Sequence, residues 1–380
     1  MLAPGIHPVA SMRSELDALV DRRFAGGDRS TALVIGSGVN LQAAIEVGAS
    51  ALDWERLLRE IEAHEGIVWD GDPPRSMTAR WEALLQRQSK QRASDREDDM
   101  VRTVVDRLEH QTEQIWAKAG GRPPPLYTDL LGKRFRDVVS LNFDDRLARA
   151  GTKARLFRAT SPAETKLRRG STFSVLPQLY QRYHLPSAEG FTRIWHPHGR
   201  SSSQSTLVLG VGRYGRLVAD LDVGWGRYKS AEREFGEAPS RDAALFPAPR
   251  SRRHWTRRQI ARWSEHRRAP GPWLADGRPA QRMSYRRPHE ALSWLDVVLM
   301  SPLLIIGCGL GSDEFPLWWA LHQRARNQAR HPARTQVPVV LVTAEPRAAH
   351  ELDHLRGGPG GLCTAVFPTW AELWAWVRSI

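Results

Sequence analysis

Short runs of consecutive apolar residues recur along the chain and predict buried strands. The first run covers residues 31–35, and a second covers residues 136–141. Further runs occupy residues 155–157, 193–195, 206–209, 302–306, 337–343 and 365–367. Several runs are apolar throughout rather than alternating, as expected for strands that helices cover on both faces. The pattern predicts an α/β fold of Rossmann-like type, with a doubly wound, mostly parallel sheet.

Between residues 52 and 118, apolar side chains recur at helical spacing with many charged residues between them. The positions that carry this spacing are Trp54, Leu57, Leu58, Ile61, Trp81, Leu84 and Leu85. The segment predicts a helical insertion over about residues 50–120. A shorter amphipathic stretch at residues 14–24 predicts an N-terminal helix within residues 1–30.

The chain has 380 residues, which suits two structural units or one large α/β domain with insertions. We expect the second arrangement, with the sheet domain spanning residues 31–380. From about residue 220 to residue 290 the composition shifts to Arg, Trp, Gly and Pro, with little strand pattern. This shift predicts a second, Arg/Trp-rich insertion.

The formal net charge is +13, which favours polyanionic surroundings such as nucleic acid or nucleotides. The most basic stretch, residues 250–268, holds eight Arg and one acidic residue, with Trp255 and Trp263 between them. Arg and Trp side chains together suit nucleic-acid binding, because cations meet phosphates and rings stack on bases. A helix that docks through Trp255, Ile260 and Trp263 with a solvated basic face explains the same pattern.

Cysteine is scarce, because only Cys308 and Cys363 are present. This excludes a disulfide framework and a zinc site of four thiolates, so we expect no zinc or other metal. The first residues lack a basic region followed by an apolar one. The most apolar stretch, residues 292–307, is too short to cross a bilayer. The sequence thus predicts a cytoplasmic protein without a membrane segment.

Glycine-rich turns follow two of the predicted strands, Gly36-Ser-Gly-Val-Asn40 and Gly307-Cys-Gly-Leu-Gly-Ser-Asp313. Glycines let a backbone approach a pyrophosphate, and a following helix offers unpaired amides and the positive end of its dipole. Helix-like sequence resumes at Leu41 after the first turn. Compact turns with a purely structural role have a similar sequence. On that interpretation, Asp313 caps a helix that starts near Glu314.

A third segment, Ser140-Leu-Asn-Phe-Asp144, also follows a predicted strand. Ligands of open α/β sheets bind beyond the carboxyl ends of the strands, which is where Asn142 and Asp144 are expected. Asn142 is suited to orient a ribose hydroxyl or a water molecule. Alternatively, Asp144 or Asp145 caps the next helix.

The fourth segment is Trp195-His-Pro-His-Gly199. The glycine leaves the His198 imidazole uncrowded, and a histidine with a pKa of about 6.5 can take a proton at neutral pH. A structural histidine is the alternative. A metal site is not expected, because no cysteine or third histidine lies at ligand spacing.

In this order the four segments resemble the sirtuin-like domain, especially its divergent bacterial branch of NAD-consuming enzymes. Residues 36–40 match the opening glycine motif, and residues 140–144 match the Thr-x-Asn-x-Asp segment. His198-Gly199 matches the His-Gly pair, after which the branch runs through an apolar stretch to a Tyr, here Tyr214. Residues 307–313 are similar to the late Gly-x-Ser-Leu-x-Asp motif.

Four departures from the family pattern bear on the chemistry. The four zinc-binding cysteines of deacetylase sirtuins are absent, and so is the acidic and aromatic loop that follows their first motif. In the late motif Gly309 replaces Ser, and one extra residue precedes Asp313. Peptide deacylation is therefore not expected.

The resemblance instead implies hydrolysis of NAD+ to nicotinamide and ADP-ribose by an antiphage effector that depletes cellular NAD+. Asn142 is implied to position the ribose or water, His198 to act as base, and Asp144 to hold the loop or stabilise positive charge. The implied NAD-binding residues are Gly36, Ser37, Gly38, Asn40, Gly307, Gly309, Asp313, Thr343 and Glu345.

The same resemblance implies a homo-oligomer that is controlled by a partner, such as an Argonaute-like protein or a DNA translocase ATPase. Two other functions fit the sequence. The basic residues 250–268 suit a nucleic-acid-binding or nuclease module, which steep salt dependence of binding would reveal. A sensor that binds NAD or ADP-ribose without turnover is the other.

Overall fold

The protein is described by a computed structural model. The described residues are 6–21, 31–74, 76–87, 93–133, 135–154, 156, 161–162, 179, 182–187, 190–235, 293–330, 338–348, 350–356 and 361–380. Residues 155 and 157, and most of the predicted Arg/Trp-rich insertion including residues 250–268, lie outside them. Among the helices that are described, none combines the length and apolar character that a membrane span requires.

One sheet organises the described residues, with the strand order β1-β9-β8-β7-β2-β3-β6-β5-β4. All neighbours from β1 to β6 in this order run parallel, while β5 is antiparallel to both β6 and β4. The strands are β1 (Ile6–Pro8), β2 (Ala32–Ile35), β3 (Asp137–Ser140), β4 (Ser161–Pro162), β5 (Arg182–Ser187), β6 (Gly190–Trp195), β7 (Leu303–Ile306), β8 (Val339–Thr343) and β9 (Leu362–Val366).

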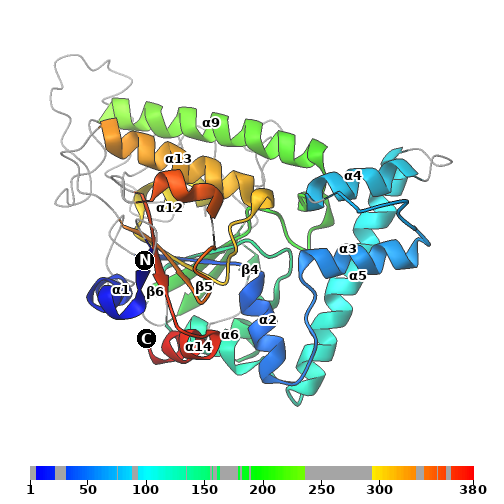
Figure 1. The fold of residues 1–380 in the computed structure, drawn as a ribbon, viewed down its shortest axis with the longest axis horizontal. Coiled ribbons are helices and arrows are strands. Elements are labelled where there is room, and N and C mark those ends of the chain that lie inside the picture. Colours follow the sequence, from blue (N-terminus) through cyan, green and yellow to red (C-terminus); the bar gives the residue numbers. More distant parts are fainter. Residues whose placement is uncertain are drawn as a thin grey trace.

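Helices cover both faces of this sheet (Figure 1). One face carries α9 (Val211–Phe235), α12 (Trp294–Met300) and α13 (Phe315–Arg330). The opposite face carries α1 (Arg13–Asp21), α2 (Ser37–Glu46), α6 (Pro125–Gly132), α7 (Arg146–Lys153) and α14 (Trp370–Ser379). Short 3-10 helices are η1 (Val9–Met12), η5 (Gln204–Thr206), η7 (Ser312–Glu314) and η8 (His350–Leu355).

The central strand β2 shows why its sequence is apolar at every position. Ala32 and Val34 pack into the core beneath α12 and α13, whereas Leu33 and Ile35 pack toward α2, α6 and α14. Successive side chains of a strand point to opposite faces, and both faces are buried here. The arrangement confirms the predicted α/β class with a mostly parallel sheet.

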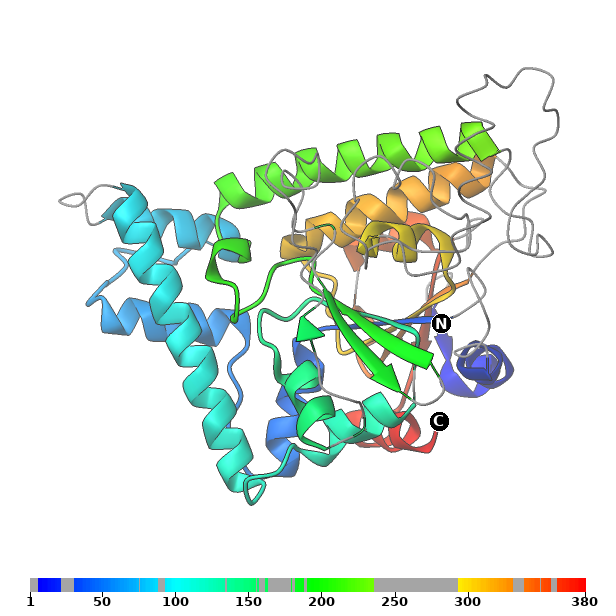
Figure 2. The ribbon, with the colours of Figure 1, turned by 180° about the vertical axis from the view of Figure 1, so that it is seen from behind.

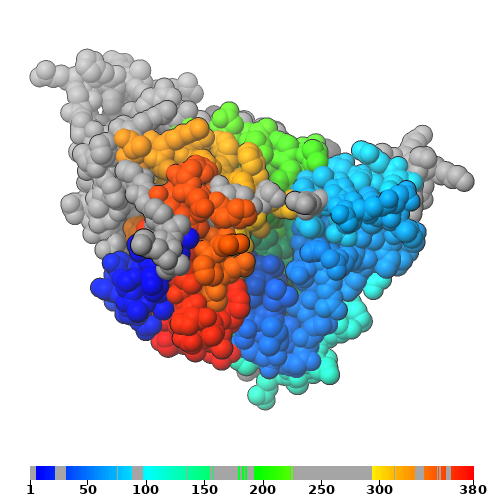
Figure 3. All heavy atoms as spheres, in the orientation of Figure 1, coloured from blue at the N-terminus to red at the C-terminus, as the bar shows by residue number. Residues whose placement is uncertain are grey.

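The N-terminal region contains a strand that its sequence does not indicate. Residues Ile6, His7 and Pro8 form β1, which pairs in parallel with β9 at the sheet edge. Proline is tolerated at such an edge because no ladder hydrogen bond is required on the outer side. The chain then enters α1, which lies beside α14, so the first and last described segments share one surface (Figure 3).

The region with helical spacing forms three helices, α3 (Trp54–His64), α4 (Met77–Arg87) and α5 (Ala93–Lys118). They share a core of their own beside the sheet, and the long α5 passes behind α3 and α4 in Figure 1 and in front of them in Figure 2. Asp53 begins α3 by accepting a hydrogen bond from the Arg56 amide at 2.7 Å, as an N-cap residue does.

The prediction of a strand at residues 206–209 is wrong. Thr206 ends the short η5, and Leu207 and Leu209 then pack into the core of α3, α4 and α5. The Val208 amide donates to the His198 carbonyl at 2.9 Å. The apolar run is therefore a connection that docks the helical insertion, which periodicity alone cannot distinguish from a strand.

Candidate functional site at the carboxyl edge of the sheet

Asn142 and His198 follow adjacent parallel strands at matching positions. Val139 of β3 pairs with Trp195 of β6, and the two site residues come equally far after them. His198 Nδ1 hydrogen bonds with the carbonyl oxygen of Leu141, the residue before Asn142, at 3.2 Å. The structure thus brings these two predicted site residues to neighbouring loops on one edge of the sheet.

The two glycine-rich turns meet at the same edge, because Ile35 of β2 pairs with Ile306 of β7. The Gly38 amide donates to the Gly307 carbonyl at 2.9 Å. A Cβ at Gly36 would lie 2.5 Å from the Gly307 oxygen. Gly307 itself has φ +65°, a conformation that favours glycine. These glycines therefore permit backbone-to-backbone packing of one turn on the other.

Helix α2 starts earlier than the sequence indicates. It begins at Ser37 rather than near Leu41, with Gly36 as its N-cap residue, so the motif is a strand end plus a first helical turn. Ser37 is exposed there, whereas Gly36 and Asn40 are buried. The backbone amides of a first helical turn have no intrahelical partners, and here Gly38 uses its amide on the Gly307 turn.

Asn142 links its loop to the first glycine turn. Its Nδ2 donates to the Gly36 carbonyl oxygen at 3.1 Å, and the side chain is buried. Hydrogen bonds therefore join the loop after β7 to the loop after β2, and the loop after β2 to the loop after β3. The bond between His198 and the Leu141 carbonyl oxygen adds the loop after β6. Polar groups from four neighbouring strands thus share one edge.

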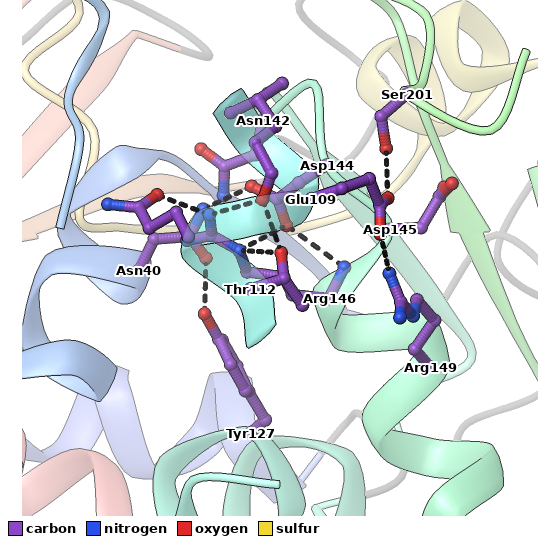
Figure 4. Close-up of polar contacts among 12 residues, drawn as sticks. Asn40, Glu109, Thr112, Tyr127, Asn142, Asp144, Asp145, Arg146, Arg149 and Ser201 are labelled. Carbon is purple, nitrogen blue, oxygen red and sulfur yellow. Dashed lines mark hydrogen bonds and ion pairs between the residues drawn. The ribbon is translucent and has the colours of Figure 1, made fainter. Parts of the chain in front are cut away.

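Asn40 and Asp144 lie in a buried network beside this edge (Figure 4). Asn40 Nδ2 donates to Asp144 Oδ2 at 2.6 Å, and the Tyr127 hydroxyl donates to Asn40 Oδ1 at 2.8 Å. Asp144 Oδ1 accepts from the Arg146 amide at 3.0 Å, so Asp144 rather than Asp145 makes the capping contact at the start of α7. The network ties α2, α6 and α7 to the loop that carries Asn142.

Arg146 extends the network to the helical insertion. Its Nε donates to Thr112 Oγ1 of α5 at 2.8 Å, and its Nη2 donates to the Gln111 side chain and the Leu108 carbonyl. The guanidinium is fully buried and lies 3.8 Å from Asp144. A buried cation needs such partners, so α5 and the Asn142 loop are held together.

His198 is enclosed by two aromatic rings, with centroid separations of 5.9 Å to Phe143 and 5.8 Å to Tyr214. Burial disfavours the charged imidazolium and lowers the pKa of His198 to about 4. The Leu141 carbonyl can only accept, so Nδ1 carries the proton and Nε2 presents a lone pair. His198 is thus a neutral imidazole whose Nε2 carries a lone pair and is enclosed.

Glu314 is a site residue that the sequence reasoning missed. Its Oε2 lies 3.8 Å from His198 Nε2. Burial, with the neighbouring Asp313 charge as a smaller cause, raises the pKa of Glu314 to about 8. In the sequence, only its place directly after the glycine-rich motif, which ends at Asp313, points to Glu314.

Asp313 faces the helical insertion. Its carboxylate accepts hydrogen bonds from the hydroxyls of Ser76 and Thr78 and from the amides of Met77 and Thr78, at 2.9 to 3.3 Å. Its backbone oxygen accepts from the Tyr214 hydroxyl at 2.7 Å. Asp313 therefore caps α4, far away in sequence, instead of α13.

Replacing Asp313 with alanine is expected to lower the free energy of unfolding by about 1–3 kcal/mol, because two amides and two hydroxyls lose their acceptor. Asp53→Ala is the matched control, since it removes a single local N-cap contact worth about 1 kcal/mol. Urea denaturation measures both. Equal losses in the two variants would contradict the long-range capping role.

Three predicted NAD-binding residues remain, Gly309, Thr343 and Glu345. Gly309 is exposed, and a Cβ there would meet no described atom within 4 Å. Thr343 ends β8, next to β7, and its Oγ1 accepts from the Glu345 amide at 2.9 Å. Thr343 is buried, whereas the Glu345 side chain is exposed.

Neither a protein-family model nor a curated protein matches this chain. Across the ranges that the structure describes, no three His, Cys, Asp or Glu side chains gather as a metal site requires.

Proposed function

We propose that the protein is a sirtuin-like, Rossmann-like NAD+ hydrolase that cleaves NAD+ to nicotinamide and ADP-ribose. The observation that supports this most is the convergence of Asn142 and a neutral His198 on adjacent loops at the carboxyl edge of the sheet. The conclusion also draws on the order of the four sequence motifs.

The strand order supports a dinucleotide at this edge. From β2 the chain continues to β3 on one side, whereas β7 lies on the other side and leads on to β8. Ligands of open α/β sheets bind where the strand order reverses in this way, outside the carboxyl ends of the strands. The turns at Gly36 and Gly307 flank that position, which suits a pyrophosphate beside them.

In this reaction the protein acts by orienting groups and accepting a proton, and it forms no covalent bond to the substrate. The bond between nicotinamide nitrogen and ribose C1′ breaks, and nicotinamide leaves with the bonding electron pair. A water oxygen then bonds to C1′ and releases a proton. We assign Asn142 to orienting the ribose or the water, and His198 Nε2 to accepting a proton from a hydroxyl or the water. Asp144 holds the loop through Asn40 and Arg146.

The biological role that we propose is depletion of NAD+ during phage infection, under control of a protein partner or of oligomerisation. The contact of α4 with Asp313 and of α5 with Arg146 supports control through the helical insertion. A partner that moves either helix would disturb groups directly bonded to the site loops.

Cells that express the protein are expected to lose NAD+ and accumulate nicotinamide and ADP-ribose after phage challenge. Cells that express Asn142→Ala at equal protein level should keep their NAD+. Mass spectrometry of extracts measures all three compounds. Restriction of phage with unchanged NAD+ would contradict the proposal, and NAD binding without products would identify a sensor.

A further inference from the structure

His198 and Glu314 present two polar atoms that face each other without a partner. Nε2 of His198 and Oε2 of Glu314 are both enclosed, and neither has a hydrogen-bond partner among the described residues. They lie 3.8 Å apart, too far for a direct hydrogen bond. A buried polar atom without a partner is costly, so a pair of them in one place points to a group that completes it.

The protonation states of the two side chains are complementary. The hydrogen bond from Nδ1 to the Leu141 carbonyl leaves a lone pair on His198 Nε2. The Glu314 side chain is partly exposed but its Oε2 is enclosed, and burial raises the pKa of Glu314 to about 8, which favours the protonated form at neutral pH. One side of the gap therefore offers an acceptor and the other side a donor.

We propose that Glu314 and His198 together bind one ribose hydroxyl of the nucleotide substrate. The hydroxyl oxygen accepts a hydrogen bond from the Glu314 carboxyl group and directs its own proton at His198 Nε2. An oxygen placed about 2.8 Å from each atom can bridge their 3.8 Å separation from the side, once the groups that enclose both atoms make room for it. This assignment rests on the proposed NAD+ hydrolase function and adds Glu314 as a catalytic residue.

During the reaction the hydroxyl proton moves to His198 Nε2, which becomes an imidazolium. The charge left on the ribose oxygen is stabilised by the hydrogen bond from Glu314 and by the positive charge that develops on the ribose. Return of the proton restores all groups, so no external oxidant or acid is consumed. Ligand entry requires one of the flanking rings, Phe143 or Tyr214, to move, because both polar atoms are enclosed.

Four side chains surround Glu314 and bear on its titration. Tyr214 from α9 and Cys308 from the turn after β7 keep their protons near neutral pH, because burial raises the pKa of each. Asp313 accepts hydrogen bonds from α4, and His198 faces Glu314 from the loop after β6. His198 and Glu314 are thus the pair whose protonation changes the hydroxyl site.

The pH dependence of kcat/KM for NAD+ tests the inference. Activity needs a neutral His198 and a protonated Glu314, so it should fall below pH about 4 and above pH about 8. Glu314→Gln keeps a hydrogen-bond donor that does not titrate, so activity should stay within about tenfold and lose the alkaline decline. Glu314→Ala should lose more than about tenfold. Glu55→Gln, on an exposed part of α3, is the control and should match the wild type.

Binding of ADP-ribose by the full chain, measured calorimetrically across the same pH range, separates this inference from hydrolysis. An alkaline loss of affinity in wild type but not in Glu314→Gln supports the hydroxyl site even where NAD+ is not cleaved. Hydrolysis with an unchanged alkaline decline in Glu314→Gln overturns the role of Glu314 alone. Absence of both binding and turnover in the wild type overturns the inference and the proposed function together.

Discussion

His198→Ala is expected to reduce nicotinamide release from NAD+ by about 10²–10⁴-fold, the usual contribution of a positioned general base. The loss follows from removing Nε2, whose lone pair is directed by the hydrogen bond between Nδ1 and Leu141. Single-turnover measurements of nicotinamide formation at saturating NAD+ would report the chemical step. Asn142→Ala should show a comparable loss. The substitution removes the carboxamide that bonds to the Gly36 carbonyl oxygen and that we assign to orienting the substrate.

His64→Ala is a suitable control for this experiment, because His64 is an exposed residue at the end of α3. It should retain wild-type activity. Thermal unfolding of each variant verifies that the fold is intact, since an imidazole removed from a buried position also leaves a cavity. A folded His198→Ala protein with full activity would contradict the assignment of the base.

Gly199→Ala is expected to produce the largest loss of stability among the substitutions considered. Gly199 has φ +80°, and a Cβ there would overlap the carbonyl group of Thr206. The left-handed conformation costs about 1–3 kcal/mol for a residue with a side chain. Overpacking against backbone that is itself bonded adds about 1–3 kcal/mol. The free energy of unfolding should therefore fall by roughly 2–6 kcal/mol.

Gly48→Ala separates these two contributions. Gly48 has a similar φ of +66°, but a Cβ there would meet no atom within 4 Å in the described part of the chain. It should lose only the conformational part, about 1–3 kcal/mol. Urea denaturation of both variants gives the difference, and equal losses would show that the contact with Thr206 contributes nothing. Because Gly199 follows His198, the Gly199→Ala protein should also lose activity under conditions where it remains folded.

The position of the site loops could be predicted from sequence, whereas their internal connections could not. Asn142 and His198 each follow an apolar run that forms a strand, and parallel strands end at one edge of a sheet. The capping of α4 by Asp313 joins residues more than two hundred positions apart, so no local pattern could reveal it. The same applies to Glu314, because His198, which faces it, follows a different strand far away in sequence.

Two local patterns were ambiguous for a different reason. The apolar run at residues 206–209 docks the helical insertion, because buried connections and buried strands have the same composition. Strand β1 is short and contains Pro8, so its sequence shows no strand pattern. It forms a strand because pairing with β9 satisfies its backbone hydrogen bonds.

The sequence by itself determined the class of fold, the helical character of residues 52–118 and the loops in which polar residues follow strands. Burial on both faces requires apolar residues along a strand, and such a run can be recognised in the amino-acid sequence. Only the tertiary structure decided that the glycine turns pack on each other, that Asp144 and Asn40 join a buried network, and that Glu314 faces His198. Such pairs depend on distances between separate loops, which the order of residues does not encode locally.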